Sequence, residues 1–336
     1  MDLINLFKKK AKKNPQRIVL PEGEEERILR AAEIVSEEGI AYPLLLGNNK
    51  KIKEKINHFG IDLANLRIID PLNFPKISEY VSFYCTMRKD RSISERMARL
   101  ILKKSLNLGA LMVKLGEADG LVAGSINLTA SVIKSGILMI GLKKDVSLPS
   151  SFFIMRIPGV SRGEKGLLIF ADAAVNPDPN PSQLAEIAIT TARSAQVLLG
   201  WEPRVALLSF STKRSASHPL VDKVIKATQI VQRKAPHLLV DGDLQADAAL
   251  IPEIAQNKVK GSPVAGKANI LIFPNLDSAN ISYKLVQHLA QGQAYGPILQ
   301  GFNRPINDLS RGASLENIVT VITLTAVQAQ DKENYR

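Results

Sequence analysis

The sequence predicts an α/β fold whose strands are mostly parallel. Short runs of aliphatic and β-branched residues alternate, along 336 residues, with longer segments whose apolar residues recur at helical spacing. Glycine, proline and short polar residues separate the two kinds of segment. Because parallel neighbours need a long crossover connection, usually a helix, this alternation favours helices layered on parallel sheets.

The short apolar runs are expected to form strands. They are Arg17–Leu20, Tyr42–Leu46, Arg67–Asp70, Gly120–Ala123, Gly166–Phe170, Arg204–Phe210, Leu238–Val240, Asn269–Phe273 and Gly296–Gln300. Helices are expected at Glu24–Glu38, Ser94–Leu106, Pro181–Leu199 and Pro219–Lys234. A last helix is predicted from Leu315 to about Gln330, with Ser314 as its N-cap. A change of composition at Lys143–Ser151 indicates a domain boundary.

The composition narrows the class of protein. The net charge is +12, which fits a nucleic-acid partner, a small anionic substrate, or a lysine-rich solvated surface. The basic residues are scattered and only 5% of residues are aromatic, so nucleic acid is the least favoured partner.

Metal and membrane sites are not expected. The single cysteine, Cys85, excludes internal disulfides and cysteine-based metal sites, and the four histidines are far apart in the sequence. No apolar run is long enough to span a membrane, and the lysines near the start precede no apolar segment. We therefore expect a cytoplasmic protein without a metal.

Polar, turn-prone loops follow several of the predicted strands. They begin after Leu20, Val122, Phe170, Phe210 and Phe273. Each alone is a common strand-to-helix turn, but ligands of open α/β sheets bind at such carboxyl ends. Five of them in one chain make a shared cleft plausible.

The segment Gly301–Gly312 reads as a polar loop that leads into the last helix. It offers the hydroxyl of Ser310, the guanidinium of Arg311, the flexible Gly312 and free backbone N–H groups beside the positive end of a helix. Such groups can hold an anion such as phosphate. A surface turn before an ordinary capped helix is the alternative.

Taken together, these segments resemble the phosphate acetyltransferases (phosphotransacetylases) over nearly the whole chain. The resemblance rests on several ordered motifs, which are Phe170–Asp172 with Asn176-Pro177, Leu208–Lys213, Asp241–Ala249, Phe273–Leu276, Ala279–Lys284, Gly296–Gly301 and Pro305 with Asn307–Gly312. So many matches in order are specific for the family.

The resemblance implies a fold and an activity. It implies two α/β/α domains with a cleft between them, residues 1–144 with 300–336 and residues 145–299, like isocitrate and isopropylmalate dehydrogenases in fold only. It also implies a homodimer that converts acetyl-CoA and phosphate to acetyl phosphate and CoA, without a metal or organic cofactor. The chain has no Gly-x-Gly-x-x-Gly motif after a strand that would bind a nicotinamide cofactor.

The resemblance also assigns site residues. Ser310 and Arg311 match the family's active-site pair, with Arg311 on the phosphate or acyl phosphate and Ser310 on the reacting carbonyl or thiol. Arg88 matches an arginine linked to CoA binding, with an exposed arginine at a helix end as the alternative. Thr129 lies in a loop that faces the same cleft in relatives, and a helix-cap role is equally open. Lys213 ends a matching motif and is expected to bind substrate.

Several positions depart from the family pattern. Asn317 stands where the family has an aspartate proposed as base for the thiol, and an amide cannot accept a proton at neutral pH. It could donate to an oxyanion, or simply occupy the third helical position, where the family carboxylate would complete a capping box. Lys134 replaces an arginine, Ser135 a proline and Arg214 a glycine. These changes leave open an active phosphate acyltransferase, for acetyl, propionyl or butyryl groups, or a catalytically weak protein that binds CoA or acyl phosphate.

Overall fold

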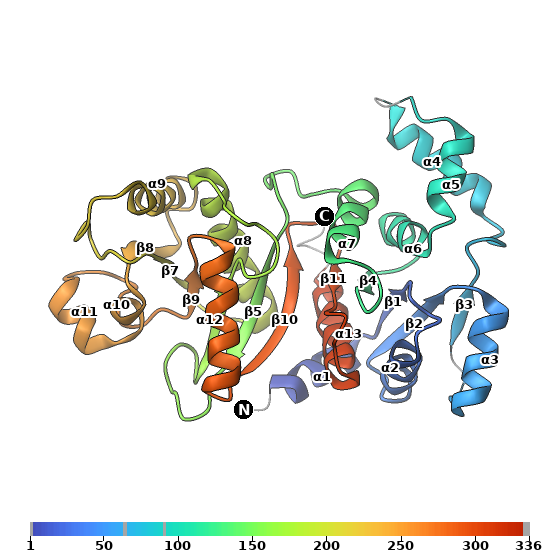
Figure 1. Ribbon diagram of the computed structural model, residues 1–336, viewed down its shortest axis with the longest axis horizontal. Helices are drawn as coiled ribbons and strands as arrows, with labels where there is room; N and C mark the ends of the chain where they lie inside the picture. Colours follow the sequence, from blue (N-terminus) through green and yellow to red (C-terminus); the bar gives the residue numbers. More distant parts are fainter. Residues whose placement is uncertain (1–2, 63–65, 90–91, 332–336) are drawn as a thin grey trace. The chain divides into compact units, whose positions relative to one another are not determined.

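The computed structural model describes residues 3–62, 66–89 and 92–331. The chain forms two compact units, unit 1 from Met1–Gly141 and Phe302–Arg336 and unit 2 from Leu142–Gly301 (Figure 1). Each unit has its own sheet and its own helices, and each is described by itself.

Unit 1 contains a five-stranded sheet in the order β11-β4-β1-β2-β3, in which every neighbouring pair is parallel. Its strands are β1 (Gln16–Leu20), β2 (Ala41–Leu46), β3 (Arg67–Ile69), β4 (Gly120–Ala123) and β11 (Ile306–Asp308). Asp308 pairs with Ala123 at the end of β4. Because all strands point the same way, the loops after β1, β4 and β11 leave the sheet at one edge.

Helices cover both faces of this sheet (Figure 1). One face carries α1 (Leu3–Lys13), α2 (Glu26–Glu37) and α13 (Leu315–Gln330), with α3 (Asn49–Phe59) beside α2. The other carries α6 (Ser105–Lys114), α7 (Thr129–Ser135) and the π-helical turn η2 (Gly136–Ile140). The helices α4 (Ile77–Met87) and α5 (Glu95–Leu102) pack on each other, and α5 also contacts α6.

The last helix, α13, is the central helix of unit 1. All its residues from Ile318 to Ala329 are buried, since it packs on the sheet as well as on α1 and α2. The buried amide of Asn307 ties β11 to it, because Nδ2 donates to Thr325 Oγ1 at 2.8 Å and to Gln328 Oε1 at 2.6 Å. The segment after β11 is therefore anchored on both sides, by β11 before it and by α13 after it.

Unit 2 contains a six-stranded sheet in the order β10-β5-β6-β9-β7-β8. The strands are β5 (Ser150–Arg156), β6 (Leu167–Ala171), β7 (Arg204–Leu208), β8 (Leu239–Leu244), β9 (Ile270–Ile272) and β10 (Gln293–Gln300). Strand β5 runs antiparallel to both neighbours, and the remaining pairs are parallel. The helices are α8 (Pro181–Leu199), α9 (Pro219–Lys234), α10 (Ala246–Leu250), α11 (Pro252–Lys258) and α12 (Leu276–Leu289).

The predicted α/β class with mostly parallel strands is confirmed. The helices predicted at 181–199, 219–234 and 315–330 have the predicted bounds, and Ser314 is the N-cap of α13. The single helix predicted at 94–106 is wrong, because the chain breaks at Lys103-Lys104 into α5 and α6. Two strands were not predicted: β5, an apolar run that begins at the expected domain boundary, and β11, a strand of three residues inside the segment expected to be a loop.

Among the helices that the structure describes, none combines the length and apolar character needed to cross a membrane.

Candidate active site

Three loops of unit 1 meet at the carboxyl edge of its sheet, and together they form the candidate site. They follow β1 (from Pro21), β4 (from Gly124) and β11 (from Leu309). Direct hydrogen bonds join the first loop to the second, the second to the end of β11, and α2 to the third. The site is therefore built from segments that lie 103 to 286 residues apart in the sequence.

Glu22 is the buried carboxylate that shapes the loop after β4. Its Oε1 accepts the backbone N–H groups of Ile126 (3.0 Å) and Asn127 (2.7 Å) and the side-chain amide of Asn127 (2.8 Å). Its Oε2 accepts the backbone N–H and the hydroxyl of Ser125, and Gly124 N–H lies 3.0–3.1 Å from both oxygens. Burial alone would raise the pKa of Glu22, but these hydrogen bonds outweigh it and hold the pKa below its usual value.

Asp308 is the second buried carboxylate of the site. Its side chain is 2% exposed, and its Oδ2 accepts a hydrogen bond of 2.5 Å from the hydroxyl of Thr129. Its Oδ1 has no partner among the described residues. A Cβ on Gly124 would overlap this oxygen and the carbonyl of Leu309, so glycine is required there. Burial, opposed by the Thr129 hydrogen bond and reinforced by the charge of Glu22, raises the pKa of Asp308 to about 6.

Arg27, at the start of α2, holds the loop after β11. Its Nη1 donates to the carbonyl oxygens of Arg311 (3.0 Å) and Ala313 (2.8 Å). Its Nε donates to Glu25 at 2.7 Å, and Glu25 is in turn the N-cap of α2. Two loop carbonyls are thus fixed by one guanidinium, which is itself oriented by a carboxylate.

Ser310 and Arg311 lie in the loop between β11 and α13. Both side chains are exposed, and that of Arg311 makes no hydrogen bond or ion pair with the residues that the structure describes. Ser310 Oγ accepts a weak hydrogen bond of 3.4 Å from Gly312 N–H. The guanidinium is therefore available to a phosphate, next to the first turn of α13.

Asn317 occupies the third position of α13. Its backbone N–H donates to Ser314 Oγ at 3.2 Å, as expected for a residue three places after the N-cap, and its side chain is exposed. The capping position anticipated for this residue is confirmed. Its contribution to catalysis stays a prediction.

The hydroxyl of Thr129 does not cap a helix. The N-cap of α7 is Leu128, which offers no side-chain hydrogen bond, and Thr129 is the first helical residue. Its hydroxyl is used instead by Asp308. Of the two interpretations open from the sequence, the structure excludes the cap.

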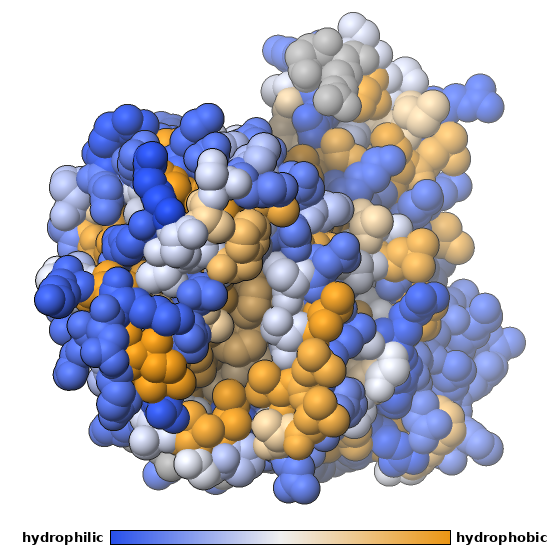
Figure 2. All heavy atoms as spheres, turned by 60° about the vertical axis from the view of Figure 1, so that its left-hand side comes forward, coloured by the Kyte–Doolittle hydropathy of each residue, from blue (hydrophilic) through white to orange (hydrophobic). Residues whose placement is uncertain are grey.

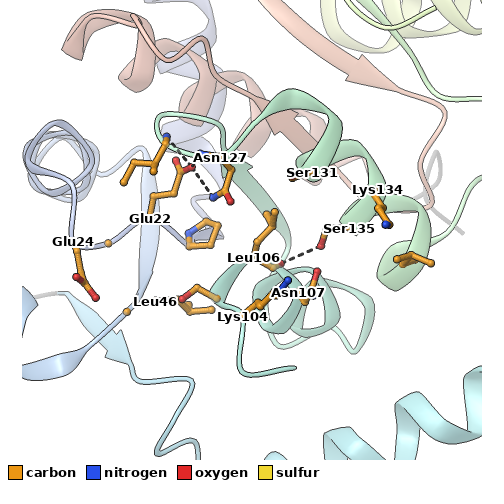
Figure 3. A pocket seen from close by; sticks show the side chains of 16 residues that line it. Glu22, Glu24, Leu46, Lys104, Leu106, Asn107, Asn127, Ser131, Lys134 and Ser135 are labelled. Carbon is orange, nitrogen blue, oxygen red and sulfur yellow. Dashed lines mark hydrogen bonds between the residues drawn. The ribbon is translucent and has the colours of Figure 1, made fainter. Parts of the chain in front are cut away.

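A pocket of about 530 Å³ lies beside the site in unit 1, between the loops after β1 and β4 and the helices α6 and α7. Figure 3 shows Glu22 and Asn127 on one side of it and Lys134 with Ser135 on the other. Lys134 and Lys104 are exposed lysines among the lining residues. Two ammonium groups in one hollow are suited to a phosphorylated ligand.

Arg88 is the C-cap residue of α4, so the helix-end position is confirmed. It is half-buried, and its Nη2 donates to the carbonyl of Leu138 at 2.6 Å. Leu138 lines the same pocket as Lys134. Arg88 therefore packs against the wall of the pocket, and its Nε is buried without a partner among the described residues.

Lys213 and Arg214 belong to unit 2 and lie between β7 and α9. Lys213 forms an ion pair with the buried Asp241, whose other oxygen accepts from Ser262. Both residues have positive φ, 51° for Lys213 and 62° for Arg214. Arg214 thus stands where a left-handed backbone favours glycine, the residue expected there from the family pattern.

Unit 2 also has a buried carboxylate that accepts hydrogen bonds from the backbone of a loop after a strand, as Glu22 does in unit 1. Asp172, directly after β6, accepts from the backbone and hydroxyl of Ser151 and from the backbone N–H groups of Ala174, Val175 and Asn176. Burial raises the pKa of Asp172 in spite of these bonds. The Asp172 carboxylate therefore holds the backbone of the polar loop that follows Phe170.

Three residues that join the loops of the candidate site, Glu22, Arg27 and Asp308, were not predicted from the sequence. The strand-end segment from Pro21 and the motif from Asn307 were both noted, so a carboxylate at each strand end was an available signal. Nothing local distinguishes Arg27, whose partners lie 284 and 286 residues away. Within the described ranges, no three His, Cys, Asp or Glu side chains are grouped so as to hold a metal ion.

Comparison with known proteins gives the family. The sequence model of the family described as Phosphate acetyl/butaryl transferase matches residues 2–326. The chain belongs to this family. A phosphate acetyltransferase of Thermoanaerobacterium thermosaccharolyticum is 50% identical over 98% of this chain and 100% of its own length. One of Acetivibrio thermocellus is 46% identical over 98% and 99%.

Solved structures agree with this assignment. A phosphotransacetylase from Streptococcus pyogenes superposes with a TM-score of 0.93 at 39% identity, covering 98% of both chains. A 4-hydroxythreonine-4-phosphate dehydrogenase from Klebsiella pneumoniae superposes with a TM-score of 0.56 at 12% identity, covering 94% of this chain and 100% of that chain. This likeness concerns the fold alone. The predicted family and the dehydrogenase-like fold class are thus confirmed.

Proposed function

We propose that this protein is a phosphate acetyltransferase, which transfers an acetyl group reversibly between CoA and inorganic phosphate. The observation that carries the proposal is the Ser310-Arg311 loop, with its guanidinium free, its carbonyls fixed by Arg27, and the first turn of α13 directly behind it. The name and full-length similarity of the relatives support the same activity. The reaction connects acetyl-CoA with acetyl phosphate, as acetate metabolism requires.

The chemistry needs cations and fixed donors. Both substrates are anions, so Arg311 is placed to bind the phosphate or acyl phosphate, and Ser310 to meet the reacting carbonyl or thiol. The amide of Asn317, one turn into α13, is a donor for the oxyanion that develops during acyl transfer. No metal or organic cofactor enters this proposal.

We place the phosphorylated part of CoA at the pocket beside the site. Lys134 lines it together with Lys104, Arg88 packs against its wall, and Thr129 starts the helix that carries Lys134. Lysine provides charge without the two-pronged geometry of arginine, so we expect weaker orientation of a phosphate at position 134. Lys213, in unit 2, remains a proposed substrate-binding residue.

The test measures thioester formation from CoA and acetyl, propionyl or butyryl phosphate. The absorbance of the thioester gives the rate. The expected result is turnover with acetyl phosphate and a loss of about 100-fold or more in kcat/KM in Arg311→Ala, since a lost anion-binding guanidinium costs several kcal/mol. Arg30→Ala is the matched control, because Arg30 pairs with the exposed Glu26 on the surface of α2. Absence of turnover with all three acyl phosphates would rule the proposal out.

A second candidate is a catalytically weak homologue that binds CoA or acyl phosphate. The observations that favour it are Lys134 and Asn317 in place of a guanidinium and a carboxylate, and the left-handed Arg214. Calorimetric binding of CoA by a protein without turnover would support this candidate. Robust turnover by the wild type would eliminate it.

A homodimer in the cytoplasm completes the proposal, and α12 is the surface we assign to the dimer. Ile281, Leu285 and Leu289 are 57%, 52% and 79% exposed, and their spacing of four residues puts them on one side of the helix. Figure 2, in which the side of unit 2 comes forward, shows hydrophobic side chains at the surface among hydrophilic ones. An aliphatic stripe can pair with its own copy across a two-fold axis.

Light scattering after size exclusion tests this assignment. We expect a dimer for the wild type and for Lys284→Ala, and a monomer for Leu285→Asp. A wild-type monomer at micromolar concentration would refute the dimer. A Leu285→Asp dimer would place the interface elsewhere.

A further inference from the structure

Three features of Asp308 bear on the chemistry of the site. It lies two residues before Ser310, it is 2% exposed, and one of its oxygens, Oδ1, has no partner among the described residues. Its other oxygen accepts from Thr129, whose side chain is half-exposed at the start of α7. A buried carboxylate is thus connected to the surface of the site through one hydroxyl.

Acyl transfer from acetyl phosphate to a thiol requires a proton acceptor, and the candidates can be compared one by one. The amide of Asn317 cannot accept a proton near neutral pH. Glu316 is the adjacent residue on α13 and points about 100° away from Asn317. Both oxygens of Glu22 are already occupied by N–H and O–H donors. Asp308 remains, with one donor on Oδ2 and an empty Oδ1.

We infer that Thr129 and Asp308 form a proton relay that accepts the proton of the CoA thiol. The inference rests on the proposed function. Thr129 touches the thiol, and Asp308 acts through Thr129 as a positioning and proton-accepting residue. The hydroxyl already donates to the carboxylate in the structure, so the relay needs no rearrangement of these two groups.

The step balances in atoms and charge. The thiol proton moves to Thr129 Oγ1 while the Thr129 proton moves to Asp308 Oδ2. The sulfur forms a bond to the acetyl carbon, and the bond from that carbon to the phosphate oxygen breaks. The departing phosphate takes up one proton to become hydrogen phosphate, which returns Asp308 to its charged form. In the opposite direction the same relay gives the proton to the leaving CoA thiolate.

The surroundings suit Asp308 to this task. Three elements of the described structure pack against β11, namely β4, α7 and α13. Strand β4 has no charged residue. The charged residue of α7 is Lys134 and that of α13 is Glu316, and both are exposed. Arg311 in the following loop is exposed as well, whereas Glu22 acts on Asp308 directly. With its pKa raised to about 6, mainly by burial, Asp308 is charged at neutral pH and still basic enough to take a proton.

The experiment compares Thr129→Val, Thr129→Ser and Asp308→Asn in the full chain, by kcat and KM for thioester formation between about pH 5 and about pH 8.5. We expect Thr129→Val to lower kcat about 100-fold or more at pH 7.5 with KM for CoA changed less than about threefold, and Thr129→Ser to stay within about tenfold of wild type. The acid limb of kcat, with an apparent pKa near 6 in wild type, should disappear in Asp308→Asn.

Thr129→Val keeps the inference testable if Asp308→Asn does not fold, because residue 129 is half-exposed at a helix start. A folded Thr129→Val protein that retains kcat within about threefold and keeps the acid limb overturns the relay. An equal loss of kcat in Thr129→Val and Thr129→Ser also overturns the relay. Serine keeps the hydroxyl and valine lacks it, so equal losses would mean that the hydroxyl takes no part in the reaction. A wild type without turnover refutes the proposed function instead, so the two failures are distinguishable.

Discussion

Glu22→Gln is the sharpest test of how the site is built. The change keeps the size of the side chain and replaces one carboxylate oxygen by an NH2 group. In the wild type every hydrogen-bond partner of this carboxylate is a donor, namely the backbone N–H groups of residues 124–127, the Ser125 hydroxyl and the Asn127 amide. The new NH2 group is a donor and therefore faces N–H groups from which it cannot accept hydrogen bonds.

The cost can be worked from these contacts. The least damaging choice puts the NH2 group at the position of Oε2, since the Ser125 hydroxyl can rotate to accept from it and Gly124 keeps its bond to Oε1. Ser125 N–H is then left without its acceptor, at about 1–3 kcal/mol, and the remaining bonds lose the assistance of the charge. The sum is a loss of roughly 3–5 kcal/mol in the free energy of unfolding.

Urea unfolding followed by circular dichroism measures this loss, and hydrogen exchange localises it. We expect the amides of residues 124–127 to exchange faster in Glu22→Gln than in wild type. The matched control is Glu24→Gln, because Glu24 accepts from Asn48 N–H at 3.1 Å and pairs with the exposed Lys51 at 3.7 Å, a loss of about 1 kcal/mol at most. The single tryptophan, Trp201, lies in unit 2, so its fluorescence reports separately on that unit.

The pH dependence gives a second check. Because the pKa of Glu22 is lowered in the folded state, its stabilisation is present above the unfolded pKa of about 4.3 and is lost as the pH falls through the folded value. The difference between wild type and Glu22→Gln should thus be constant near neutral pH and shrink below about pH 4. The reasoning is refuted if Glu22→Gln unfolds at the same urea concentration as the wild type and its amides at 124–127 exchange no faster. The carboxylate would then not hold the loop.

Three further predictions concern the departures and the loop anchor. Arg27→Ala should lower kcat/KM by about 10- to 100-fold and speed amide exchange at residues 310–314, because two loop carbonyls lose their donor; unchanged kinetics would separate the anchor from catalysis. Arg214→Gly should raise the stability of unit 2 by about 0.5–1 kcal/mol in urea titrations of Trp201 fluorescence, because φ of 62° disfavours a side chain while the backbone bond to Asp243 is kept; a loss of stability would contradict this reading. Asn317→Asp should stabilise the protein by about 0.3–1 kcal/mol through the dipole of α13 and change kcat less than about threefold, whereas a rise of tenfold or more would move the base to position 317.

Local signals explain why much of the fold could be predicted. The bounds of α8 and α9 follow from an N-cap residue and a proline at the first helical position, Asn180-Pro181 and His218-Pro219. The start of α13 follows in the same way from Ser314. These signals lie within a few residues of the boundary they fix, so a single sequence contains them.

The missed elements depend on distant partners. Strand β11 is three residues long and forms because distant segments hold it: Ile306 pairs with Leu121 of β4, and Asn307 donates to Thr325 of α13, 18 residues further along the chain. The lysines at 103 and 104 end α5 although the apolar pattern continues into α6. Only the fold determines which of these segments is paired or broken.

The site shows the same division. Ser310, Arg311 and the capping position of Asn317 could be named from one segment, because the loop and the helix start are continuous in sequence. The contacts of Arg27 with residues 311 and 313 could not, since nothing near Arg27 in the sequence marks them. The kinetics of Asn317→Asp test whether this residue contributes to catalysis.

The two carboxylates at the edge of the unit 1 sheet show how one edge gives different chemistry to similar groups. Glu22 and Asp308 each follow or end a strand, and both are almost fully buried. Glu22 meets donors on both oxygens, so its pKa falls and its charge is committed to shaping a loop. Asp308 accepts from the Thr129 hydroxyl on one oxygen and has no partner on the other among the described residues, and its burial raises its pKa. The hydrogen bonds of Glu22 thus suit it to holding a loop, and the single bond of Asp308 to Thr129 suits it to the proton-accepting step that we propose.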